Sequence, residues 1–139
     1  MTPGDSDTIY TTWAGVRKST DGGQTWVELS EGIAGVQPQQ IAASPKDPDR
    51  VWVAAKSDGG FGSTDAGNAW VKYPESQPCG AVAFDPGSPT TAYFGRKDFI
   101  YKTTEDGQHW QPKSRMPLTG LPSHYDFADI YAIAPHPLT

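Results

Sequence analysis

Polar and aromatic side chains suited to binding or hydrolysis are concentrated in a few segments outside the apolar runs. The longest of these segments, residues 112–129, contains Arg115, His124, Tyr125, Asp126 and Asp129. Two shorter segments contain Asp58 and Arg96. A sugar or peptide site needs aromatic rings for stacking and a few converging polar groups, and these residues include both. Each also has a simpler explanation, because polar loop residues are usually solvated and Asp58 precedes two glycines, as turn residues do.

Composition and charge exclude several classes of function. The 139-residue chain has a net charge of −5, so it lacks the clustered Lys and Arg that nucleic-acid binding requires. Cys79 is the single cysteine, and no His, Cys and Asp cluster has metal-ligand spacing. No apolar stretch approaches roughly 18 residues, and the residues after Met1 lack the features of a secretory signal. We therefore expect no metal or cofactor, no nucleic-acid partner and no membrane insertion.

The elements that position these residues follow an internal repeat. The segment Ser19–Trp26, with sequence STDGGQTW, recurs as STDAGNAW in Ser63–Trp70 and more loosely as TTEDGQHW in Thr103–Trp110. The intervals are 44 and 40 residues, which match one four-stranded propeller blade. A high content of Gly (15) and Pro (13), with five Trp, six Tyr and five Phe, suits short strands and tight turns.

A second pattern recurs out of phase with the first. An apolar run, a turn bounded by prolines and another β-forming run appear at 41–54 and again at 82–94, and the pattern begins once more at 130–137. One unit therefore reads strand A, proline turn, strand B, loop, strand C, tight turn, strand D.

This order predicts an all-β chain with twelve short strands and essentially no helix. Residues 1–29 supply strands B, C and D of the first blade, residues 40–73 the second blade and residues 81–112 the third. Residues 113–129 form a long loop, and residues 130–139 form strand A of a closing blade. Because propellers have roughly four to eight blades, three blades are either part of a larger propeller or half of a six-bladed one. In the second case a second copy closes the ring, and strand A pairs with Thr8–Trp13 of that copy.

The repeated eight-residue segments have a structural explanation that needs no catalysis. Their glycines can supply the positive φ of a tight hairpin, and an Asp side chain can accept hydrogen bonds from the turn N–H groups. The closing Trp can hold the hairpin to its own sheet. We assign this role to Ser19, Asp21, Gly23, Trp26, Ser63, Asp65, Gly67, Trp70, Thr103, Glu105, Gly107 and Trp110. Glu105 replaces the Asp of the other two copies, so the third turn should be looser.

These segments resemble the Asp-box, or bacterial neuraminidase, repeat of β-propellers, which include sialidases, xyloglucanases, sortilin-type receptors and photosystem II assembly-factor-like proteins. The resemblance covers nearly the whole chain. It implies that the boxes lie away from the ligand and that ligands bind on the face formed by the D–A and B–C loops. Here these loops are residues 30–39, 56–60, 74–80, 95–98 and 112–129. It also favours an extracellular or periplasmic location.

The resemblance implies a non-catalytic module that binds a glycan or a polypeptide, with Arg96, Arg115, His124 and Tyr125 as contacts. The alternative is part of a glycoside hydrolase. An inverting mechanism needs two carboxylates about 6.5–9.5 Å apart, and Asp58 with Asp126 or Asp129 is the best available pair. A complete sialidase site cannot be assembled, because the arginine motif that accompanies sialidase boxes is absent.

Overall fold

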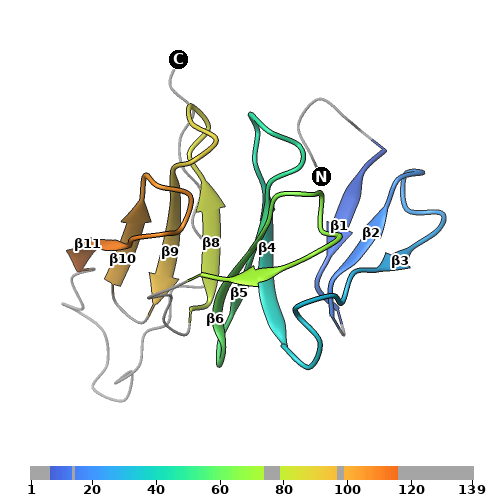
Figure 1. Cartoon of the computed structure of the whole chain (residues 1–139), viewed down its shortest axis with the longest axis horizontal. Coiled ribbons are helices and arrows are strands. Elements are labelled where there is room, and N and C mark those ends of the chain that lie inside the picture. Colours follow the sequence, from blue (N-terminus) through green and yellow to red (C-terminus); the bar gives the residue numbers. More distant parts are fainter. Residues whose placement is uncertain (1–6, 14, 74–78, 97–98, 116–139) are drawn as a thin grey trace, which may run out of the picture.

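The computed structural model describes residues 7–13, 15–73, 79–96 and 99–115. Within these residues the chain contains eleven β-strands and no helix. The strands form three antiparallel sheets that lie side by side (Figure 1). The expected all-β fold class, a partial propeller built from three sheets, is therefore confirmed.

Each sheet is a meander in which consecutive strands are neighbours. Sheet 1 contains β1 (Ile9–Thr11), β2 (Arg17–Ser19) and β3 (Val27–Glu28). Sheet 2 contains β4 (Pro38–Ala43), β5 (Val51–Ala55), β6 (Gly59–Ser63) and β7 (Val71–Lys72). Sheet 3 contains β8 (Ala81–Phe84), β9 (Ala92–Arg96), β10 (Phe99–Thr103) and β11 (Gln111–Arg115).

The strand limits differ slightly from those expected. β4 begins at Pro38, ahead of residue 40, and β11 continues to Arg115 rather than ending at residue 112. Pro112 is tolerated because β11 is an edge strand of its sheet, and the register of β10 and β11 shifts nearby, between Ile100 and Tyr101. The closing strand expected at 130–139 and residues 116–129 of the expected loop lie outside the described residues.

Sheets 1 and 2 are joined by an apolar cluster. Its members come from β1, the β1–β2 connection and the end of β3 on one side, and from sheet 2 on the other. They include Tyr10, Val16, Leu29, Val51, Val53, Phe61 and Trp70. Burial of apolar surface of this kind is the main favourable term that holds two sheets together.

Sheets 2 and 3 are joined by a second cluster, which is rich in aromatic rings. Trp52 of β5 is fully buried, and its ring centroid lies 4.7 Å from Tyr73, 5.0 Å from Phe84 and 5.6 Å from Trp110. Phe94 stacks on Trp110 with a centroid distance of 4.3 Å. Aromatic pairs at these separations add to the free energy gained from burial alone.

Two of the three tryptophans that close the repeats pack in clusters shared with a neighbouring sheet, in addition to contacts with their own sheet such as that of Trp110 with Phe94. Trp70 belongs to sheet 2 but packs in the cluster shared with sheet 1, and Trp110 of sheet 3 packs against Trp52 of sheet 2. Trp26 of sheet 1 has no such neighbour among the described residues and is 41% exposed, whereas Trp70 is 4% exposed.

We predict that Trp70→Ala destabilises the chain by about 3–5 kcal/mol, since it removes a large side chain from a closed inter-sheet cluster. Trp13→Ala is the matched control, because Trp13 is 85% exposed and its removal leaves no cavity. Urea unfolding followed by far-UV dichroism measures both. An equal decrease in the free energy of unfolding of the two variants would contradict the packing of Trp70 between sheets 1 and 2.

Candidate functional site

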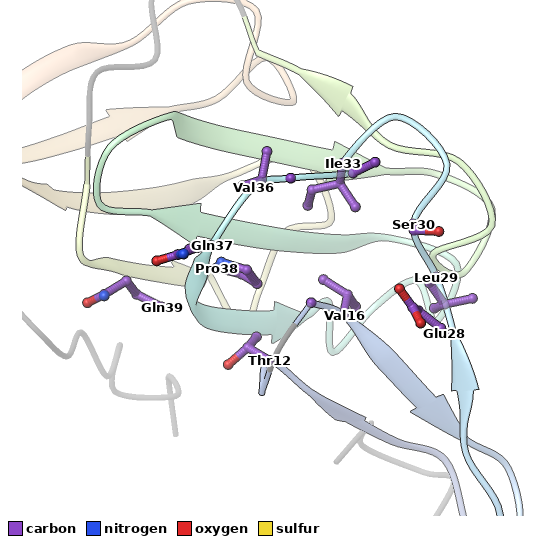
Figure 2. Close-up of a pocket in the computed structure, with 13 residues that line it drawn as sticks. Thr12, Val16, Glu28, Leu29, Ser30, Ile33, Val36, Gln37, Pro38 and Gln39 are labelled. Carbon is purple, nitrogen blue, oxygen red and sulfur yellow. The ribbon is translucent and has the colours of Figure 1, made fainter.

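A groove of about 460 Å³ lies between sheets 1 and 2, where the β1–β2 and β3–β4 connections meet (Figure 2). Its volume falls within the usual range of ligand-binding clefts. Polar lining comes from Thr12, Glu28, Ser30, Gln37 and Gln39. Apolar lining comes from Val16, Leu29, Ile33, Val36 and Pro38.

The β3–β4 connection, residues 29–37, forms one wall and is anchored by its own sequence. Leu29 and Ile33 are buried, and the backbone N–H of Leu29 donates to the Val16 carbonyl at 2.9 Å. Gly32 has a φ of 84°, and a Cβ there would overlap the Trp70 carbonyl oxygen. The Trp70 N–H in turn donates to the Glu31 carbonyl at 2.9 Å. This wall is therefore held against sheet 2 by backbone contacts that only glycine permits.

The groove has little charge. Glu28 is the single ionisable side chain among the lining residues that the structure describes. Arg17 lies opposite Glu28 in the β2–β3 register but does not belong to the lining. The Glu28 Oε1 atom lies 4.0 Å from the position that a Cβ of Gly15 would take, which places this carboxylate against the β1–β2 connection. Among the described lining residues there is no Lys or Arg to pair with an anionic ligand.

The residues expected at the ligand face are only partly brought together. Asp58 lies in the β5–β6 turn and is followed by Gly59 with a φ of 96°, as its reading as a turn residue requires. Arg96 and Arg115 are the last residues of β9 and β11, and both pair with Phe99 at the start of β10, so they lie at the same end of sheet 3. The remaining four candidates, His124, Tyr125, Asp126 and Asp129, lie outside the described residues.

The sequence patterns do not predict the full set of residues that line this groove. The segment 30–39 was expected on the ligand face, but neither the β1–β2 connection nor Glu28 was singled out. The signal lay in the alternation of small and apolar residues in Gly32–Val36, which suits a loop packed onto a sheet better than a free loop. Neither Asp58 nor Arg96 lines this groove.

The three repeated segments, Ser19–Trp26, Ser63–Trp70 and Thr103–Trp110, are called here box turns 1, 2 and 3. In box turn 1 the Ser19 hydroxyl donates to Asp21 Oδ1 at 2.7 Å and accepts the Gly23 N–H at 2.8 Å. Asp21 Oδ1 accepts the Thr25 N–H at 2.8 Å and the Gln24 N–H at 3.0 Å. These bonds, led by the one from the Thr25 hydroxyl, lower the pKa of Asp21 to about 2.

Box turn 2 repeats this network without the hydroxyl bond of Thr25, whose place Ala69 takes, and box turn 3 keeps the backbone bonds to the hydroxyl of Thr103. The Ser63 hydroxyl donates to Asp65 Oδ1 at 2.7 Å, and the Ala69 N–H, which donates to the same oxygen, is the first cause of the lowered pKa of Asp65. In box turn 3 the Thr103 hydroxyl still accepts the Gly107 N–H at 3.1 Å. The Glu105 carboxylate approaches the His109 ring, at 3.9 Å, instead of the turn backbone. Glu105 thus makes fewer bonds to its turn than the two aspartates do.

The box turns lie at the end of the sheets opposite the groove. The N–H groups of Gly22, Ala66 and Asp106 donate to carbonyls of Asp7, Asp49 and Thr90, at 3.0, 2.8 and 3.0 Å. In sheets 2 and 3 these acceptors belong to the β4–β5 and β8–β9 turns, which point upward in Figure 1, whereas the β3–β4 connection and the β5–β6 turn point downward. The box aspartates are therefore remote from the groove.

Three further observations limit the chemistry of the described residues. Cys79 is buried, and burial raises the pKa of its thiol to about 12, so the reactive thiolate is disfavoured. No group of three or more His, Cys, Asp or Glu in the described ranges is arranged to hold a metal ion. Within the same ranges no helix is long and apolar enough to cross a membrane.

Comparison with known proteins supports the fold and leaves the family open. No protein-family model matches the chain, and no curated protein matches it. Among solved structures, an ancestral GH74 enzyme matches with a TM-score of 0.68 and 19% identity, over 81% of this chain and 17% of that one. YCF48 bound to a D1 peptide matches with a TM-score of 0.64 and 18% identity, over 78% of this chain and 38% of that one.

YCF48 from Cyanidioschyzon merolae is similar at a TM-score of 0.62 and 22% identity, over 81% of this chain and 35% of that one. The chain thus spans well under half the length of each of these structures. At such identities the likeness establishes the fold alone, and the chain has the sheet arrangement of a β-propeller.

We predict that Asp21→Ala lowers the thermal midpoint at pH 7, because it leaves the Gln24 and Thr25 N–H groups without their acceptor. Since the folded-state pKa of Asp21 is depressed, its stabilisation is complete above the unfolded pKa of about 4 and disappears as the pH falls toward about 2. Between those two pH values the thermal midpoint of the variant should therefore fall less than that of the unmodified chain.

Glu105→Ala is the matched control for this prediction, because it removes a box carboxylate that does not bond to its turn backbone. Differential scanning calorimetry across pH 2–7 compares the two variants. A pH profile for Asp21→Ala that is parallel to that of the unmodified chain would contradict the assigned role of the aspartate.

Proposed function

We propose that the chain is part of a non-catalytic β-propeller module that binds a polypeptide, with a glycan as the second class of ligand, at the face where the B–C and D–A loops meet. The observation that carries this proposal is the groove between the β1–β2 and β3–β4 connections. It combines an apolar floor with hydroxyl and amide groups along its rim, a lining suited to an uncharged backbone and an apolar side chain.

Several features favour binding over hydrolysis. Glu28 is the single carboxylate among the described lining residues, whereas inverting hydrolysis needs a pair about 6.5–9.5 Å apart. Asp58, expected to take part in such a pair, lies in a different turn. Arg96 and Arg115, at the same end of sheet 3, are proposed contacts for a ligand long enough to extend along the same face.

One of the similar structures supports a peptide ligand by analogy, because it is described as YCF48 bound to a D1 peptide and matches 78% of this chain. A GH74 xyloglucanase from Xanthomonas campestris, which matches 78% of this chain at a TM-score of 0.59, supplies the analogy for a glycan. The neutral, partly apolar lining of the groove is the reason for placing the polypeptide first.

We predict that Ala34→Trp, which places an indole in the groove from an exposed lining position, weakens binding by about tenfold or more, equivalent to about 1.4 kcal/mol. Lys46→Trp is the control, since it adds the same group in the β4–β5 turn at the opposite end of sheet 2. Ligands are first selected from a library of immobilised peptides and an array of neutral oligosaccharides, and affinities are then measured by calorimetry.

The glycoside-hydrolase alternative has a distinct signature. Release of reducing sugar from xyloglucan oligosaccharides, abolished by Glu28→Gln or Asp58→Asn in a folded protein, would replace the proposed binding role with a catalytic one. Binding that is equally strong in Ala34→Trp and in the unmodified chain would remove the groove from the proposal.

A further inference from the structure

We propose that box turn 1 of one copy docks on the outer face of sheet 3 of a second copy, so that two copies form a closed ring of six sheets. The same kind of contact already joins sheet 2 to sheet 1 and sheet 3 to sheet 2 within one chain. In both internal instances the box turn of one sheet seats on the preceding sheet. A Cβ at Gly67 would lie 2.5 Å from Leu29, and one at Gly107 would lie 2.6 Å from Tyr73.

Box turn 1 is built like box turn 2, yet within the described residues no neighbouring sheet covers it. Its serine and glycine make the same hydrogen bond, at 2.8 Å in both turns, so the docking element is already formed. Its tryptophan is far more exposed, because Trp26 is 41% exposed where Trp70 is 4% exposed, and the Trp26 indole N–H donates to the Gly23 carbonyl at 3.1 Å. A large aromatic group exposed on a preformed turn is the type of residue that dominates protein interfaces.

The outer face of sheet 3 reproduces the face of sheet 1 that receives box turn 2. Tyr93 occupies the register position of Tyr10, since Ala92 pairs with Thr103 as Ile9 pairs with Ser19. The lysine beside each tyrosine ring is repeated as well. The Lys18 Nζ atom lies 5.6 Å from the Tyr10 centroid, and Lys102 Nζ lies 5.5 Å from that of Tyr93.

The same correspondence supplies a hydrogen bond. The Tyr10 hydroxyl donates to the Ala66 carbonyl of box turn 2 at 3.1 Å, which fixes that turn on sheet 1. Gly22 holds the place of Ala66 in box turn 1. The Tyr93 hydroxyl, now 3.3 Å from Asp85 Oδ2, is therefore in position to donate to the Gly22 carbonyl of the second copy.

One position departs from this pattern and defines the chemistry of the contact. Lys113, three residues after Trp110, takes the place that Leu29 has after Trp26. Its aliphatic stem can cover Gly23 as Leu29 covers Gly67, while its ammonium group lies over the face of Trp26. The new interface thus has a cation–π contact at the position where the internal one has the apolar contact of Leu29 with Gly67.

The contact joins two different surfaces of the chain, box turn 1 and the outer face of sheet 3. Copies therefore add head to tail, and they form a closed ring only when the number of copies fits the rotation between them. Two copies give six sheets, within the range of roughly four to eight blades seen in propellers, whereas three copies give nine. The ring of two copies is therefore the expected assembly.

Light scattering after size exclusion tests the assembly with the unmodified chain, which should elute at twice its mass of 15.0 kDa. Trp26→Glu and Lys113→Glu alter the two sides of the contact, and each should raise the dissociation constant of the dimer by about 100-fold or more, as loss of an interface hot spot does. Val71→Glu is the matched control, because Val71 is a 66% exposed apolar residue of sheet 2, outside both sides of the contact, and it should leave the dimer intact.

A mixture of the two variants gives a second readout. In a pair made of one Trp26→Glu chain and one Lys113→Glu chain, one of the two contacts keeps both native sides, so the mixture should associate where each variant alone does not. Dichroism confirms that each variant is folded, and Lys113→Glu, at an exposed position, tests the contact should Trp26→Glu fail to fold. A monomeric unmodified chain, or a dimer insensitive to both substitutions, would overturn the proposal.

Discussion

The seating of each box turn on the preceding sheet is the interaction on which the rest of this structure depends. It requires a glycine at the point of closest approach, because a Cβ at Gly67 or Gly107 would overlap Leu29 or Tyr73. It also requires a large apolar group, which Trp70 and Trp110 supply. Hydrogen bonds within the turn keep it closed, and apolar burial between sheets supplies the larger part of the free energy of association.

This constraint separates a structural end of the molecule from a variable one. The box turns and the turns that accept their N–H groups form one end, where hydrogen bonds recur from sheet to sheet. The described loops at the other end share one backbone bond, from Leu29 N–H to the Val16 carbonyl in sheet 1 and from Tyr73 N–H to the Gly60 carbonyl in sheet 2, and otherwise differ in sequence. The groove between the β1–β2 and β3–β4 connections arises there, where Val16, Leu29 and Ile33 anchor the two loops. Functional sites on such scaffolds are expected in loops that a rigid framework positions.

The joint between sheets 2 and 3 contains an ion pair, whereas the polar contacts described between sheets 1 and 2 are neutral hydrogen bonds. Arg50 pairs with Asp106 of box turn 3 and with Asp47, which raises the pKa of the guanidinium through the Asp106 hydrogen bond above all. Asp106 adopts a φ of 54°, which is unusual for a residue other than glycine, and this ion pair helps to hold it there. Burial raises the pKa of Tyr73 beside this pair, so the phenol stays neutral. The Arg50–Asp106 ion pair and the packing of Tyr73 against Gly107 therefore both hold box turn 3 on sheet 2.

The sequence by itself determined the strand order, the three tight turns and the roles of Ser19, Asp21 and Gly23, because these depend on local spacing and backbone conformation. It also indicated the weaker third turn through Glu105. Only the tertiary structure decided what Trp70 and Trp110 pack against, since contacts between sheets join residues that no local pattern relates. The groove belongs to the same class, because Thr12, Glu28 and Gln37 are separated along the chain and meet only when sheets 1 and 2 pack together. Local spacing and backbone conformation specify each repeat, whereas a site between two repeats depends on how their dissimilar loops pack together.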